Sequence, residues 1–119
     1  MALGSLGDIA VDPLIGSLQD EDWHIRMGSA IALRIIGDPR GIDPLIRSMA
    51  DESRFVRREA VKSLGRIGDT RATDRLIAAL EDSDIGVRTR AAGALGKIAD
   101  PRALPSLTRA LSDRNVELH

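Results

Sequence analysis

The chain has 119 residues, 43% of them hydrophobic, with 17 basic and 18 acidic side chains. Its formal net charge of -1 excludes a protein whose overall field draws it to DNA or to an anionic membrane, so a charged partner has to recognise a local patch. The absence of cysteine excludes disulfides and thiolate metal sites.

The first eight residues, MALGSLGD, do not form a targeting segment. They lack the basic start and the apolar run of a signal peptide. No later stretch reaches the roughly 18 unbroken apolar residues of a membrane-spanning helix. We therefore expect a cytoplasmic protein with no membrane contact.

From residue 37 onward the chain repeats itself. GDPRGIDPLIRSMAD begins at Gly37, GDTRATDRLIAALED at Gly68 and ADPRALPSLTRALSD at Ala99, so each copy begins 31 residues after the previous one. A fixed period in this range is typical of stacked supersecondary units.

Each copy opens with an apolar stripe whose spacings of three and four residues predict an amphipathic helix, here called an A helix. The stripe contains Val11, Leu14 and Leu18, then Ile42, Leu45 and Met49, then Thr73, Leu76 and Leu80, then Leu104, Leu107 and Leu111.

A second stripe in each copy, with spacings of four, four and three, predicts a longer B helix. It contains Ile25, Ser29, Leu33 and Ile36, then Val56, Ala60, Leu64 and Ile67, then Val87, Ala91, Leu95 and Ile98, and it restarts at Leu118. The alanines on this stripe allow neighbouring helices to approach closely.

Helix-capping residues recur at the expected boundaries. Aspartates precede each A helix, prolines follow two of them, and a second column of capping residues precedes each B helix. Glycines end two B helices, where a left-handed turn is common. These residues are Asp38, Asp69 and Asp100; Pro39 and Pro101; Asp22, Ser53, Asp84 and Asn115; and Gly37 and Gly68.

One charged column also recurs. An aspartate in the loop before each B helix is followed six residues later by an arginine, in the pairs Asp20 and Arg26, Asp51 and Arg57, and Asp82 and Arg88. Such a column could hold an ion or a phosphate. Because it recurs in every copy, we interpret it as a structural ladder in which each aspartate pairs with an arginine of its own or the adjacent copy.

These motifs resemble HEAT repeats, in the short form typical of the phycobilisome-lyase type. Residues 37–67, GDPRGIDPLIRSMADESRFVRREAVKSLGRI, and residues 68–98 match that pattern over their whole length, and residues 9–36 match it more loosely. The resemblance implies an all-α, right-handed α-α superhelix with B helices on its concave side. It also implies a protein-interaction scaffold or, in some members, a subunit that attaches a bilin chromophore.

The same pattern predicts that the chain is one domain made of stacked units. Residues 1–8 resemble the end of a preceding B helix, and residues 99–119 form a partial fourth unit after the units at 9–36, 37–67 and 68–98. Neither end carries a polar capping unit, which solenoids need. We therefore expect a segment of a longer array, or self-association through the ends.

The outward positions of the B helices hold six basic residues and one acidic residue, Glu59. We predict a basic face that binds an acidic protein, with a merely solvated face and a weak binder of the nucleic-acid backbone as the alternatives. Scarce aromatic residues leave few platforms for base stacking. The predicted partner-binding residues are Met27, Ile31, Arg34, Phe55, Arg58, Lys62, Arg66, Arg90 and Lys97.

An apolar strip of Met27, Ile31 and Ile35 is expected to be covered by a preceding repeat or to bind a partner. Trp23 is expected to pack against the loop. We predict no enzymatic activity, no cofactor and no catalytic or metal site, because His24 and the terminal His119 are the only histidines and the carboxylates recur as caps and ladder members.

Overall fold

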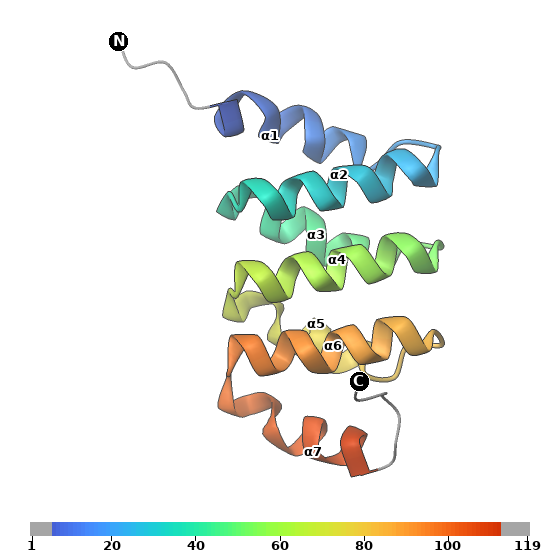
Figure 1. Ribbon diagram of the computed structural model, residues 1–119, viewed down its shortest axis with the longest axis vertical. Coiled ribbons are helices and arrows are strands. Elements are labelled where there is room, and N and C mark those ends of the chain that lie inside the picture. The colour runs from blue at the N-terminus through green and yellow to red at the C-terminus, as the bar shows by residue number, and fades with distance from the viewer. Residues whose placement is uncertain (1–5, 113–119) are drawn as a thin grey trace.

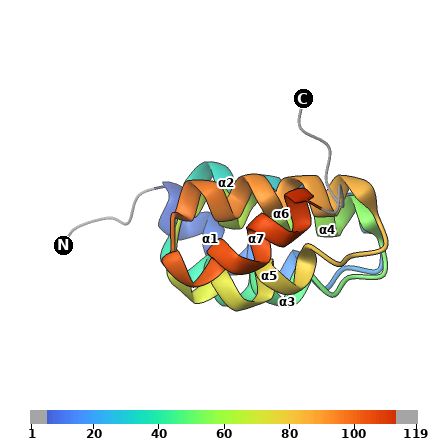
Figure 2. The same ribbon diagram turned by 90° about the horizontal axis from the view of Figure 1, so that it is seen from below.

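The computed structural model describes residues 6–112, and within that range it contains seven α-helices in two layers (Figures 1 and 2). The B helices form one layer and the A helices the other. The B layer consists of α2 (Trp23–Ile36), α4 (Arg54–Ile67) and α6 (Ile85–Ile98), and the A layer of α1 (Leu6–Ser17), α3 (Ile42–Ser48), α5 (Thr73–Ala79) and α7 (Leu104–Ser112). The predicted all-α repeat solenoid is confirmed.

A 3-10 turn precedes three of the A helices. These turns are η1 (Pro39–Gly41), η2 (Thr70–Ala72) and η3 (Pro101–Ala103). The predicted aspartate caps start these turns and not the α-helices themselves. In η1, for example, the Arg40 amide donates to Asp38 Oδ1 at 2.9 Å. The α-helical part of α3 and α5 is therefore only 7 residues long.

The first A helix differs from this pattern. It has no preceding 3-10 turn within the described residues, and α1 runs without a break from Leu6 to Ser17 with Pro13 inside it. Residues 6–8, which the sequence pattern assigned to a preceding B helix, are therefore the first turn of α1. The rest of that assignment, like the predicted roles of Asn115 and Leu118, lies outside the described residues.

The B helices begin and end as predicted. The side chains of Asp22, Ser53 and Asp84 accept amide hydrogen bonds at the starts of α2, α4 and α6. Gly37 and Gly68 adopt φ values of 72° and 79° at the ends of α2 and α4. Caps and stops of this kind depend on local sequence, which explains why the repeat pattern predicts them.

The core lies between the two layers and continues from one repeat to the next. Leu33, Leu45, Leu64, Leu76 and Leu95, which belong to the two predicted stripes, are each at most 2% exposed. Since each repeat packs on its neighbours, burial accumulates along the stack. None of the helices between residues 6 and 112 is long and apolar enough to cross a membrane.

The aspartate–arginine column joins successive repeats. Arg26 Nε lies 2.8 Å from Asp51 Oδ2, and Arg57 Nε lies 3.0 Å from Asp82 Oδ2, in each case 25 residues further along the chain. Towards its own loop, Arg26 donates instead to the Asp20 carbonyl oxygen at 2.7 Å. Each of these two guanidiniums thus ties its own loop to the loop of the next repeat.

The same loop contacts recur along the column. Arg57 and Arg88 donate to the backbone carbonyl oxygens of Asp51 and Asp82 at 2.8 and 2.7 Å. The carboxylates that pair with these arginines also accept backbone amides: Asp51 accepts the Ser53 amide at 2.8 Å, and Asp82 accepts the Asp84 amide. In the contacts described for this column, the arginines bind loop carboxylates and carbonyl oxygens of the protein itself.

Small side chains set the spacing of the B helices. Ser63 of α4 is fully buried and donates to the Ala30 carbonyl oxygen of α2 at 2.9 Å. Between α4 and α6, a Cβ atom added at Gly65 would lie 2.7 Å from the Cβ of Ala94, closer than packed side chains allow. Gly65 is therefore needed for the close approach of these two helices.

We expect Gly65→Ala to destabilise the protein by about 1–3 kcal/mol, as overpacking of a tight contact does, although alanine favours helices. Thermal or urea unfolding followed by circular dichroism measures the change. Gly96→Ala is the matched control, because Gly96 occupies the same repeat position in α6 with no atom within 4 Å of an added Cβ. That substitution should stabilise by up to about 1 kcal/mol, and equal effects at both sites would contradict the packing role of Gly65.

Candidate functional site

The candidate site is the outer surface of the B layer, here called the B face, which points away from the A helices (Figure 2). Of the predicted partner-binding residues, Lys62, Arg66, Arg90 and Lys97 are exposed on α4 and α6. Within residues 6–112 these four side chains form no ion pair, although Arg90 donates to the Gly86 carbonyl oxygen at 3.2 Å. They supply the accessible positive charge of the B face.

Two of the predicted binding residues are instead internal links. Arg34 of α2 donates to Glu59 of α4 at 2.7 Å, and its side chain is 14% exposed. Arg58 of α4 makes two hydrogen bonds, of 2.7 and 2.9 Å, to the carboxylate of Asp84 at the start of α6. Both charges are paired across a repeat boundary, so neither arginine contributes a free cation to the B face, and their contact with a partner stays a prediction.

The Arg58–Asp84 pair is built into the cap of α6. One Asp84 oxygen also accepts the Val87 amide at 3.0 Å, and the Asp84 side chain is 8% exposed. The hydrogen bond from Arg58, together with the Val87 amide, lowers the pKa of Asp84 to about 2. A Cβ atom at Gly86 would collide with the guanidinium, so glycine leaves the room that this pair needs.

The apolar residues predicted to lie on the outward surface of the B helices differ in exposure. Met27 and Ile31 are half-buried on α2, whereas Ile35 near its end is 77% exposed. Phe55 is 37% exposed and stacks on Trp23 of the preceding repeat, with ring centroids 5.1 Å apart. Trp23 thus packs against the next B helix, and its predicted contact with the loop stays a prediction.

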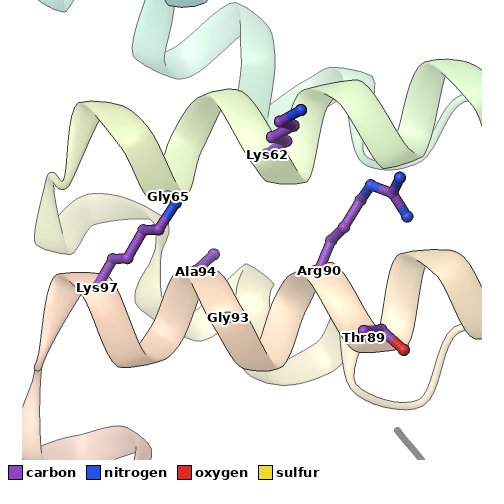
Figure 3. A pocket seen from close by; sticks show the side chains of 7 residues that line it. All are labelled: Lys62, Gly65, Thr89, Arg90, Gly93, Ala94 and Lys97. Atoms are coloured by element: carbon purple, nitrogen blue, oxygen red, sulfur yellow. The ribbon is translucent and has the colours of Figure 1, made fainter. Parts of the chain in front are cut away.

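A hollow of about 400 Å³ opens on the B face between α4 and α6 (Figure 3). Glycine and alanine form its floor, and long basic side chains surround it. In Figure 3, the Lys97 side chain extends from α6 towards α4 at Gly65. The lining residues are Lys62, Gly65, Thr89, Arg90, Gly93, Ala94 and Lys97.

The predicted set included the basic residues of this hollow and missed its floor. Gly65, Gly93 and Ala94 carry no charge and no large side chain, so a search for binding residues passes over them. The repeat alignment does contain a signal, since Gly65 stands where the preceding repeat has Arg34. A residue that departs from its column marks a place where the surface changes shape.

The arrangement offers positive charge and a shallow apolar floor. Over the part of the chain that the structure describes, no group of three or more histidine, aspartate or glutamate side chains could hold a metal ion. His24 lies beside Trp23 with ring centroids 3.7 Å apart, and its Nδ1 is 3.1 Å from Asp22.

Comparison with known proteins agrees with the fold. A sequence model described as HEAT repeats matches residues 1–59 and 42–118. A similar solved structure is the complex of CpcE and CpcF of phycocyanin lyase from Nostoc sp. PCC7120, with 29% identity and a TM-score of 0.78 over 92% of this chain and 43% of that chain.

A second similar structure is human deoxyhypusine hydroxylase in complex with glycerol, with 24% identity and a TM-score of 0.71. The match covers 96% of this chain and 48% of that chain, and at this identity it bears on the fold alone. This chain therefore spans less than half the length of either solved chain. No curated protein matches it.

We expect Asp84→Asn to lower the free energy of unfolding at pH 7 by about 2 kcal/mol, because asparagine keeps the cap acceptor but loses the charge facing Arg58. The folded pKa of about 2 lies below the usual aspartate pKa of 3.8, so the carboxylate stabilises the fold above pH 3.8. This contribution is lost as the pH falls towards 2. The difference between variant and wild type should accordingly shrink over that window in urea unfolding experiments.

Asp12→Asn is the control for this measurement, because the Asp12 side chain is 80% exposed and its contact with Arg40 is long, at 3.9 Å. A surface pair of this kind contributes little, so the change should stay within about 0.5 kcal/mol. A pH-independent loss in Asp84→Asn would contradict the ion-pair interpretation.

Proposed function

Because the chain belongs to the HEAT-repeat family, we propose that it is a non-enzymatic scaffold that binds an acidic protein partner through its B face. The observation that carries this proposal is the row of accessible cations on α4 and α6, in a protein whose net charge is -1. Such local complementarity steers association and selects partners more than it adds raw affinity.

The A side offers a different surface. There the basic residues of the 3-10 turns lie beside carboxylates, as Arg102 does at 2.9 Å from Asp100 and 3.7 Å from Asp74. Arg71 is placed in the same way between Asp69 and Asp43. At these turns the carboxylates offset the charge of the arginines, so the turns are a weaker site for an acidic partner than the cations of the B face.

Catalysis is not needed to account for the polar residues. Asp22, Asp84 and the ladder aspartates cap helices or pair with arginines, and a catalytic group would have to converge with others on a substrate site. The proposed scaffold function therefore includes no chemical reaction.

A second candidate function is that of a subunit in a bilin-attaching complex, which the 29% identity to the CpcE and CpcF structure favours. Addition of a free bilin separates the two. For a plain scaffold we expect the absorption spectrum of the bilin to stay unchanged. A shifted and sharpened absorption band would favour the second candidate.

The scaffold proposal predicts that partners contact the B face and not the A layer. A photoreactive amino acid at position 66, in place of the exposed Arg66 of α4, should crosslink to protein in an extract of the source cells. The matched control places the same amino acid at position 75, because Arg75 of α5 is also an exposed arginine but lies in the A layer.

Excess unlabelled wild-type protein should compete for these crosslinks. The double variant Lys62→Glu and Arg90→Glu should compete at least about tenfold less well, because like charges repel an acidic partner. Neither side chain has an ion-pair partner in the described part of the chain, so the melting temperature should change little. Equal crosslinking from both positions, or none, would contradict the proposal.

A further inference from the structure

The two grooves between B helices differ at two equivalent positions. In the groove between α2 and α4, Arg34 pairs with Glu59, which lies 25 residues later. One repeat further along, the same two positions hold Gly65 and Arg90. The second groove thus loses the side chain that closes the first and has a cation in place of its carboxylate.

These two changes create the hollow. Arg34 and Glu59 are 14% and 20% exposed and lie across the first groove, whereas Gly65 leaves the second open. An added Cβ at Gly93, on the floor, would meet no atom within 4 Å. Lys62, Arg90 and Lys97 surround this open space, and no acidic residue is among the described residues that line it.

We infer that the hollow between α4 and α6 binds an apolar anchor side chain of a protein segment that carries acidic residues on both sides of the anchor. This inference rests on the proposed scaffold function and adds the chemistry of the partner. The floor of Gly65, Gly93 and Ala94 suits an apolar group, since it presents no side-chain hydrogen-bond donor. The basic residues at the edges suit carboxylates.

The spacing of the cations defines the segment further. Arg90 and Lys97 are seven residues apart on α6, which corresponds to about 10 Å along the helix axis. Gly93 and Ala94 lie between them. Carboxylates that flank an anchor within a short segment can therefore reach cations at both ends of the hollow while the anchor contacts the floor.

A phosphate-bearing ligand fits this site less well. The hollow lies along the middle of α4 and α6, where backbone amides are engaged within the helices, whereas phosphate sites use free amides at helix starts or in loops. No aromatic ring is among the lining residues, so a base has nothing to stack on. The groove favours a protein segment, which can bury an apolar side chain.

The test uses the full chain and a defined probe, a blocked peptide with one central leucine flanked on both sides by glutamates. Binding is followed by NMR amide shifts, and we expect the largest shifts at Gly65, Gly93 and Lys97, with small ones at Arg34 and Glu59. Replacing the leucine by serine should weaken binding roughly tenfold or more, the effect of leaving one apolar side chain unburied.

Gly93→Leu fills the hollow and should weaken peptide binding by at least about tenfold. Gly16→Leu is the matched control, because Gly16 is an exposed helical glycine of α1, also with no atom within 4 Å of an added Cβ. It should bind the peptide like the wild type. Circular dichroism should show that both variants are folded, since leucine favours helices over glycine.

Three results would overturn the inference: unchanged peptide binding by Gly93→Leu, equal binding of an oligothymidine probe at the same residues, or Gly93-dependent dimers in light scattering, which would make a second copy the occupant. The scaffold proposal fails separately. If position 66 crosslinks to a partner and Gly93→Leu still competes for it, the scaffold stands and the hollow is not its site.

Discussion

The loops of successive repeats are joined by an arginine side chain that extends from a B helix to the loop of the following repeat, as in Arg26–Asp51 and Arg57–Asp82. The side chains of Arg26 and Asp51 are 10% and 11% exposed, so this contact is largely removed from water. Burying two charges is costly, and the cost is offset only when the remaining hydrogen bonds are satisfied. Here the backbone carbonyl oxygen of Asp20 and the amide of Ser53 complete the arrangement.

We interpret such a contact as one that specifies the register of successive repeats. Apolar layers between helices can slide, because burial is not directional, whereas a guanidinium that binds a carboxylate and a carbonyl at once has one suitable position. The pairs Arg26–Asp51 and Arg57–Asp82 repeat at the same separation of 25 residues. With register set in this way, the residues between the B helices can vary without loss of the stack.

Differences in these residues give the groove between α2 and α4 and the groove between α4 and α6 different surfaces. Between α2 and α4, Ser63 bonds to the Ala30 carbonyl oxygen and the Arg34–Glu59 pair covers the groove. Between α4 and α6, Gly65 contacts Ala94 closely and the groove is open. One scaffold geometry thus carries a closed, neutral groove beside an open, basic one. In this chain, the residues at two positions change the groove while the repeat frame stays the same.

The sequence by itself determined the helices, their caps and the solenoid class, because these depend on local contacts that the 31-residue repeat shows several times. Tertiary structure decided which charges are available. Arg34 and Arg58 occupy outward positions of their own helices, but Glu59 and Asp84 from the next repeat neutralise them. The hollow likewise exists only between two helices, since Gly65 of α4 and Gly93 and Ala94 of α6 form its floor together.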